Sequence, residues 1–219
     1  MLHCVSKVAS RPPPEALLVA KAALAAAYDN RERGITYGGG GLHNGSRLSA
    51  NIFADFRMTD GPSKELECTA DATWDGDNVY AILLTLNGGA VLHVCKKMHL
   101  IVDSSMESEA LATGKAGEAI GYAREIMRAI GYPPRGPTWV GTDNAANALV
   151  ASGNSVPARS RHCLRRYLTF LQRVQLGETT VGHVRDTENP SDFLTKFVHK
   201  EKVAKSIQYA TNSINTVTK

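Results

Sequence analysis

The chain has 219 residues, enough for one domain of ordinary size and an appendage. Its apolar share of 43% and charged share of 21% are typical of a soluble globular protein and exclude an intrinsically disordered one. The net charge of +4 favours a polyanionic partner. No apolar run approaches the roughly 20 residues of a membrane span, and the first residues lack a signal pattern, so we expect no membrane partner.

The cysteines indicate the compartment. Cys4, Cys68, Cys95 and Cys163 are widely spaced and form no CxxC pair. This spacing argues against a zinc site and against a disulfide framework, and it suits a reducing environment. We therefore expect an intracellular protein of the cytoplasm or nucleus, with an organelle as the open alternative.

The first 64 residues hold one strong helix pattern. Residues 15–28 (EALLVAKAALAAAY) have the best helix propensity in the chain and follow a run of three prolines. The four glycines at 38–41 lack the Lys-Ser/Thr of a phosphate-binding loop and indicate a flexible connection. We expect residues 1–64 to be a helix and linker, residues 65–200 a domain, and residues 201–219 a C-terminal tail.

Three strands are predicted at the start of the domain. Residues 66–73 alternate in part, and residues 78–86 are rich in Val, Tyr, Ile and Leu. Asn87-Gly88 is the signal of a tight hairpin, after which residues 90–96 form the third strand.

A long helix is predicted over residues 106–130. Ser104 and Glu107 have the spacing of a capping box at its start. Gly114, Gly117 and Gly121 lie on one line along it, and each costs about 1 kcal/mol of helix propensity. Such a cost predicts that the helix packs closely against a sheet.

The remaining elements alternate. A short strand at 138–140 runs through Gly141 and Thr142 into Asp143, and a helix-compatible run at 144–150 follows at once. A helix is predicted over 160–176, a fifth strand over 179–185, a short helix from Asn189, and a last helix after Lys200.

Four acidic residues stand where an α/β sheet places ligands. Asp143 follows a strand directly, a position that also suits a helix cap. Asp71 lies inside the first strand, Glu109 in the first turn of the long helix, and Asp192 in the first turn of the helix after strand five. Clustered carboxylates repel each other unless divalent cations neutralise them. Hard oxygen ligands favour Mg²⁺ or Mn²⁺.

Five motifs follow one another over about residues 66–200: TADATWDGD (69–77), KKMHLIVDSSMESEALA (96–112), WVGTDNAANALV (139–150), SRHCLRRYLTFLQRVQLGE (160–178) and HVRDTENPSDFLTK (183–196). In order and spacing they resemble the ribonuclease H domain of copia-type (pseudoviral) LTR retrotransposons. The resemblance implies an α/β, ribonuclease H-like fold: a five-stranded mixed sheet, three antiparallel strands then two parallel, flanked by helices. Residues 15–28 and 34–38 look like the connection from the reverse transcriptase.

The resemblance also implies a function. The four metal-binding carboxylates of the family carry over onto Asp71, Glu109, Asp143 and Asp192. Glu107 competes with Glu109, which we prefer because the family's ligand directly precedes an apolar residue, with an alanine two positions further on. The implied activity is endonucleolytic hydrolysis of the RNA strand of an RNA–DNA hybrid with two Mg²⁺ ions, or Mn²⁺.

The sequence departs from the family at three places. Thr73 replaces the second acid of the common ADADW motif, the loop after WDGD is short, and residues 42–64 look like an insertion. His183 lies in strand five, and we expect it to be structural rather than the mobile histidine of related ribonucleases H. Trp74 and Trp139 are expected in the core or at its rim.

Basic residues are the candidates for nucleic-acid contact. Five cluster at the start of one predicted helix: Arg159, Arg161, His162, Arg165 and Arg166. Helical spacing places residue 161 with 165, and 162 with 166, on shared faces. Lys96 and Lys97 form a weaker second patch. Such clusters track phosphates, although a solvated basic face has the same pattern.

Two other functions stay open on the sequence. The chain contains no Y-x-D-D motif of a reverse transcriptase. A domesticated, catalytically idle module in a larger ribonucleoprotein assembly therefore remains an alternative. An integrase of the same fold is disfavoured by the four-acid pattern and by the absence of an HHCC zinc module.

Overall fold

The computed structural model describes residues 14–29, 34–35, 66–74, 78–155 and 163–212. The chain divides into two compact units, Met1–Gly34 and Ile35–Lys219. The first contains helix α2 (Pro14–Asp29), where the sequence predicts one. Cys4 and most of the expected linker lie outside the described residues. None of the described helices combines the length and hydropathy that crossing a membrane requires.

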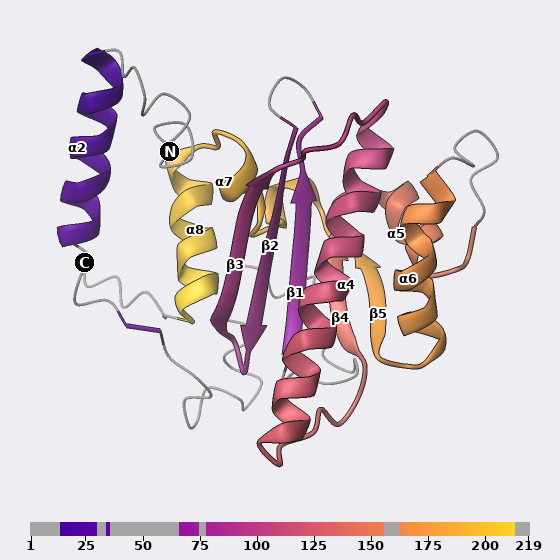
Figure 1. The fold of residues 1–219 in the computed structure, drawn as a ribbon. Coiled ribbons are helices and arrows are strands. Elements are labelled where there is room, and N and C mark those ends of the chain that lie inside the picture. The colour runs from indigo at the N-terminus through magenta and orange to yellow at the C-terminus, as the bar shows by residue number, and fades with distance from the viewer. Residues whose placement is uncertain (1–13, 30–33, 36–65, 75–77, 156–162, 213–219) are drawn as a thin grey trace. The chain divides into compact units, whose positions relative to one another are not determined.

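The second unit is built on a five-stranded mixed sheet (Figure 1). Its strands are β1 (Leu66–Ala72), β2 (Val79–Leu86), β3 (Gly89–Lys97), β4 (Thr138–Thr142) and β5 (Thr179–His183), in the spatial order β3-β2-β1-β4-β5. β1, β2 and β3 pair antiparallel, whereas β4 pairs parallel with β1 and β5 parallel with β4. This is the five-stranded mixed sheet that the sequence predicts, three antiparallel strands then two parallel.

Local sequence explains these pairings. Asn87 and Gly88 both have positive φ, as the tight turn between β2 and β3 requires. Parallel neighbours need a crossover, and helices provide it. α4 (Ser105–Ala129) connects β3 to β4, and α5 (Ala145–Ala151) with α6 (Leu164–Gln175) connects β4 to β5.

The two faces of the sheet carry separate clusters of buried side chains. Cys68, Ala70 and Val140 belong to the larger cluster, which also includes residues of α4 and α6. Strand neighbours point to opposite faces. Accordingly Trp139 belongs to the second cluster, with Tyr209 of α8 (Lys200–Thr211). The helix predicted after Lys200 is present as α8, and it is more than a C-terminal tail, since its buried Tyr209 packs on this second face of the sheet.

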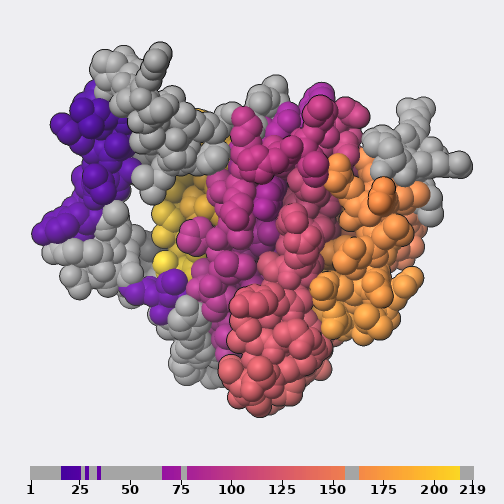
Figure 2. Space-filling view, in the orientation of Figure 1, coloured from indigo at the N-terminus to yellow at the C-terminus, as the bar shows by residue number. Residues whose placement is uncertain are grey.

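The glycines of α4 pack against α6 and not against the sheet, so that part of the prediction is wrong. A Cβ on Gly117 would lie 2.7 Å from the Phe170 ring, and one on Gly114 would lie 3.4 Å from the carbonyl oxygen of Arg166. A neighbouring face of α4, which carries Ala116 and Ile120, packs on the sheet instead. Figure 2 shows α4 and α6 side by side.

Gly117→Ala should lower the free energy of unfolding by about 1 kcal/mol. Overpacking costs about 1–3 kcal/mol, whereas alanine gains about 0.5–1 kcal/mol in a helix interior. Gly114→Ala is the matched control, because its Cβ makes an ordinary contact and should leave stability unchanged or raised. Urea unfolding of both variants measures the difference. Equal stabilisation by both would contradict the close approach of α4 and α6.

Candidate metal centre

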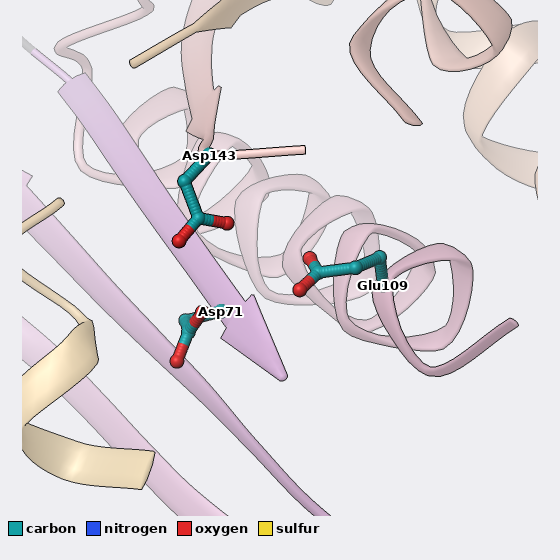
Figure 3. A group of neighbouring side chains, drawn as sticks. All are labelled: Asp71, Glu109 and Asp143. Carbon is teal, nitrogen blue, oxygen red and sulfur yellow. The ribbon is translucent and has the colours of Figure 1, made fainter. Parts of the chain in front are cut away.

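Three carboxylates converge at the carboxyl ends of β1 and β4 (Figure 3). Asp71 comes from β1, Asp143 directly follows β4, and Glu109 comes from the beginning of α4. One oxygen of each lies within 4.8 Å of the others. The parallel pairing of β1 and β4 explains the meeting, because parallel strands end at the same edge of a sheet.

A second group adjoins the first and shares Asp143 with it. Asp143, Asp186 and Asp192 also place one oxygen each within 4.8 Å of one another. Asp186 begins the short 3-10 helix η2 (Asp186–Glu188), and Asp192 begins α7 (Asp192–Thr195). The structure thus brings together the four predicted carboxylates and one that the sequence analysis missed. Asp186 follows β5 closely, as Asp143 follows β4. The rule that a carboxylate after a strand lies at the ligand-binding edge of the sheet would therefore have pointed to Asp186 too.

Glu107 has a different role from Glu109. Its Oε1 accepts hydrogen bonds from Arg166 Nε and Nη2, at 3.1 and 2.9 Å, and its Oε2 accepts one from the Asp103 backbone at 3.0 Å. Its own backbone N–H donates to Ser104 Oγ, which is the Ser104 half of the predicted capping box, whereas its side chain accepts from the backbone N–H of Asp103 and not from that of Ser104. Glu107 therefore holds the start of α4 and joins it to α6. Of the two glutamates, only Glu109 lies in the carboxylate groups.

The NPSD segment explains how β1 holds its carboxylate. Asn189 Nδ2 donates to the carbonyl oxygen of Ala70 at 3.3 Å, and the hydroxyls of Ser191 and Thr69 share a hydrogen bond of 2.6 Å. The Thr195 hydroxyl donates to Asp71 Oδ2. These bonds join the start of α7 to β1, which places Asp192 beside the end of that strand.

Asp143 does not cap α5. That role belongs to Asn144, whose Oδ1 accepts from the Asn147 backbone at 3.0 Å. The carboxylate of Asp143 instead belongs to both carboxylate groups, which together we call the metal centre. His183, at the end of β5, has its Nε2 3.1 Å from the carbonyl oxygen of Asp143. A structural role for His183 stays a prediction.

Two lysines that the sequence analysis did not single out lie among the carboxylates. Lys196 Nζ lies 3.1 Å from Asp192 Oδ1, 3.4 Å from Asp186 Oδ1 and 3.9 Å from Asp71 Oδ1. Lys202, from α8, donates to Asp192 Oδ2 and lies 4.0 Å from Asp186 Oδ2. Lys196 ends the motif NPSDFLTK, so one of the two was visible in the family pattern.

Burial and mutual repulsion keep protons on the centre. Burial, with the charge of Asp192 second, raises the pKa of Asp71 to about 7. Burial, with the charge of Asp71 second, raises the pKa of Glu109 to about 9. The pKa of Asp143 is also raised, again first by burial. A divalent cation would reverse these shifts, because it favours the ionised carboxylates.

Without metal, the protein should become less stable as the pH rises from 6 to 9. The ordinary pKa values of Asp71 and Glu109 are 3.8 and 4.5, well below their folded values. The folded state therefore binds more protons than the unfolded state in this range, and stability falls with pH. We expect the melting temperature to fall by at least about 2–4 °C, the effect of 1 kcal/mol. Differential scanning calorimetry with a chelator measures it.

Glu109→Gln is the control for this pH dependence. It removes one of the shifted groups, so its melting temperature should fall less between pH 6 and 9. Mg²⁺ should also reduce the fall in the unmodified chain. A parallel fall in both proteins would show that the dependence arises elsewhere.

The donor set suits a hard cation. Only carboxylate oxygens form the two groups, which favours Mg²⁺ or Mn²⁺ over Zn²⁺. Asp71 Oδ1 is buried and accepts no hydrogen bond from the described part of the chain. A buried carboxylate oxygen without a donor is costly unless something compensates it. The residues present therefore fit a bound divalent cation.

The predicted nucleic-acid contacts are only partly placed. Arg159, Arg161 and His162 lie outside the described residues. Arg165 is exposed, as are Lys96 and Lys97, whereas Arg166 is half-buried against Glu107. Its guanidinium joins α6 to α4.

The tryptophans lie in two different settings. Trp139 is buried, and Trp74 is 48% exposed with its Nε1 donating to the carbonyl oxygen of Val102.

A cleft of about 380 Å³ opens beside the second carboxylate group. Its lining is Asp186, Thr187, Asp192, Lys196, Phe197, Val198, His199, Glu201, Lys202 and Lys205.

The sequence is similar to a retrovirus-related Pol polyprotein from transposon TNT 1-94 of Nicotiana tabacum. The two are 28% identical over 137 residues, which is 61% of this chain and 10% of the polyprotein. The chain thus spans about a tenth of the length of this curated relative. No protein-family model matches it.

Several solved structures are similar in fold. The ribonuclease H1 of Halobacterium salinarum NRC-1 is 15% identical, with coverage of 59% of this chain and 93% of that one and a TM-score of 0.47. The LC11 ribonuclease H1 in complex with an RNA/DNA hybrid is 12% identical, with coverage of 59% and 93% and a TM-score of 0.44. A foamy viral protease-reverse transcriptase in complex with an RNA/DNA hybrid is 13% identical, with coverage of 63% and 21% and a TM-score of 0.40.

Proposed function

We propose that this chain, whose motifs resemble those of a retrotransposon ribonuclease H domain, hydrolyses the RNA strand of RNA–DNA hybrids with the help of divalent cations. The observation that carries the proposal is the convergence of Asp71, Glu109 and Asp143, with Asp192 in the adjoining group. The Pol polyprotein relative supports it.

The carboxylates would hold the cations in two adjoining places. One consists of Asp71, Glu109 and Asp143, and the other of Asp143, Asp186 and Asp192. Cations held there would supply Lewis-acid chemistry, namely activation of the attacking water and stabilisation of charge on the departing 3′ oxygen. The protein's own contribution is positioning, because β1, β4 and α4 fix the carboxylates before any substrate arrives. Thr195 orients Asp71 by donating to its Oδ2.

The substrate would be read by its backbone. A hybrid is recognised through helix shape, phosphates and 2′-hydroxyls, so we expect no sequence preference. Exposed Lys96, Lys97 and Arg165 are candidates to contact phosphates. Such contacts make binding weaken as salt rises. A reverse transcriptase in the same polyprotein is the expected neighbour.

The test compares strands and duplexes. The full chain is incubated with an RNA–DNA hybrid labelled on one strand, with Mg²⁺ or Mn²⁺, and in parallel with a chelator. We expect internal cuts in the RNA strand of the hybrid only, and none in the DNA strand or in double-stranded RNA. Cutting that persists in the chelator would contradict a metal-dependent ribonuclease H.

One observation favours the second candidate, an idle module in a ribonucleoprotein assembly. Lys196 and Lys202 already form ion pairs with Asp192, so part of the negative charge of the acidic cluster is neutralised without metal. An idle module should bind the hybrid in a gel-shift assay and leave its RNA strand intact with either cation. Metal-dependent cleavage of the hybrid would exclude it.

A further inference from the structure

The two carboxylate groups differ in their cationic partners. Neither Glu109 nor Asp143 forms an ion pair within the described residues, and Asp71 is 3.9 Å from its nearest ammonium group. In the adjoining group both oxygens of Asp192 lie against an ammonium group. Oδ1 is 3.1 Å from Lys196 Nζ, an ion pair without a hydrogen bond, and Oδ2 accepts a hydrogen bond from Lys202. A cation entering at Asp192 must therefore displace an ammonium group, whereas one entering at Glu109 need not.

We propose that Lys202, together with Lys196, is a displaceable counter-ion that occupies the Asp186–Asp192 side of the centre until a divalent cation replaces it. The centre then fills in two steps. The first cation binds at Asp71, Glu109 and Asp143 with higher affinity, and the second binds at Asp143, Asp186 and Asp192 with lower affinity. This inference rests on the metal centre of the proposed function.

Lys202 is the more tightly held of the two lysines. Its side chain is 15% exposed and the Asp192 side chain 1%, whereas that of Lys196 is 38% exposed. Water and salt screen an exposed pair more than a buried one, so the pair formed by Lys202 opposes the incoming cation more strongly. Lys202 also donates to the backbone carbonyl of Asp186, which holds it between the two carboxylates.

The structure also provides a place for the displaced ammonium group. Lys202 lines the cleft of about 380 Å³ that includes Asp192. A lysine ammonium is a compact, strongly hydrated charge on a flexible stem, so it can turn into this cleft. Lys205 lines the same cleft and belongs to the same helix, but it forms no ion pair with the carboxylates in the described part of the chain. It is the matched control.

The experiment is a calorimetric titration of the full chain with Mn²⁺, repeated with Mg²⁺, without nucleic acid. The unmodified chain should bind with two affinities. Lys202→Met should raise the weaker affinity by about tenfold, the change that 1.4 kcal/mol produces, and leave the stronger one unchanged. Lys202→Arg keeps the charge and should keep the weaker affinity low, and Lys205→Met should match the unmodified chain.

Each alternative result has a definite meaning. If Lys202→Met shows the same weaker and the same stronger affinity as the unmodified chain, the inference is overturned and the metal centre stays intact. A single affinity in the unmodified chain would also overturn it. Absence of binding in every protein would overturn the metal centre, and the inference with it. If Lys202→Met melts below the assay temperature, Lys202→Gln takes its place with the same expected rise.

Discussion

Asp143→Asn should reduce hydrolysis of the RNA strand in a hybrid by on the order of 10³-fold. Asp143 is the carboxylate that belongs to both groups, so its loss weakens both cation positions at once. Removing one preorganised electrostatic stabiliser typically costs 10²–10³-fold, and a shared ligand falls at the upper end of that scale. Single-turnover cleavage of a labelled hybrid with saturating Mg²⁺ measures the change.

The same substitution should leave the fold intact. Burial and the charge of Asp192 raise the pKa of Asp143, so its ionised form is disfavoured in the folded protein. An uncharged amide of similar shape avoids that repulsion. We expect an unchanged or higher melting temperature for Asp143→Asn at pH 7 with a chelator present. Full activity in a folded Asp143→Asn protein would refute the proposed mechanism.

Glu109→Gln and Glu107→Gln should have opposite effects, although the two residues are one helical half-turn apart. Glu109→Gln removes a ligand and should lower hydrolysis by on the order of 10²–10³-fold. It also replaces a carboxyl group whose pKa is raised by burial to about 9, so the metal-free protein should not lose stability. A catalytic loss with the fold retained is the expected result.

Glu107→Gln should instead destabilise the protein and largely keep its catalytic rate. Glu107 accepts two hydrogen bonds from Arg166 and one from the backbone of Asp103. Hydrogen bonds to charged groups contribute about 1.5–3 kcal/mol, so we expect unfolding to require about 2–3 kcal/mol less. Urea unfolding and single-turnover rates of both variants test the pair. Loss of activity in a stable Glu107→Gln protein would make Glu107 the ligand.

Short-range features of the sequence mark the positions of the candidate ligands, and the family resemblance selects Glu109 over Glu107. Asp143 ends a β-type run. Glu109 lies in the first turn of a helix whose capping residues, Ser104 and Glu107, are three residues apart. Each such feature depends on about ten consecutive residues, where local propensity and polarity patterns are strongest. For the same reason the Asn87-Gly88 turn was predictable, since its backbone angles follow from those two residues alone.

The charge environment of those ligands was decided by tertiary structure. Lys202 and Asp192 meet only because α8 packs on the sheet beside α7. Asp186 joins the centre only because β5 pairs with β4. In the same way, the glycines of α4 indicated a close neighbour, but only the packing of Phe170 on Gly117 shows that the neighbour is α6.

The sequence by itself therefore determined the strands, the order of the elements and the carboxylates that lie at strand and helix ends. Tertiary structure alone decided that Lys202 competes for Asp192, because this ion pair depends on how α8 packs beside α7, whereas the pair of Lys196 with Asp192 is a local contact four residues apart. Periodicity and turn chemistry act within a window of the chain, whereas the field at a buried carboxylate is the sum over every charge that the fold brings near it.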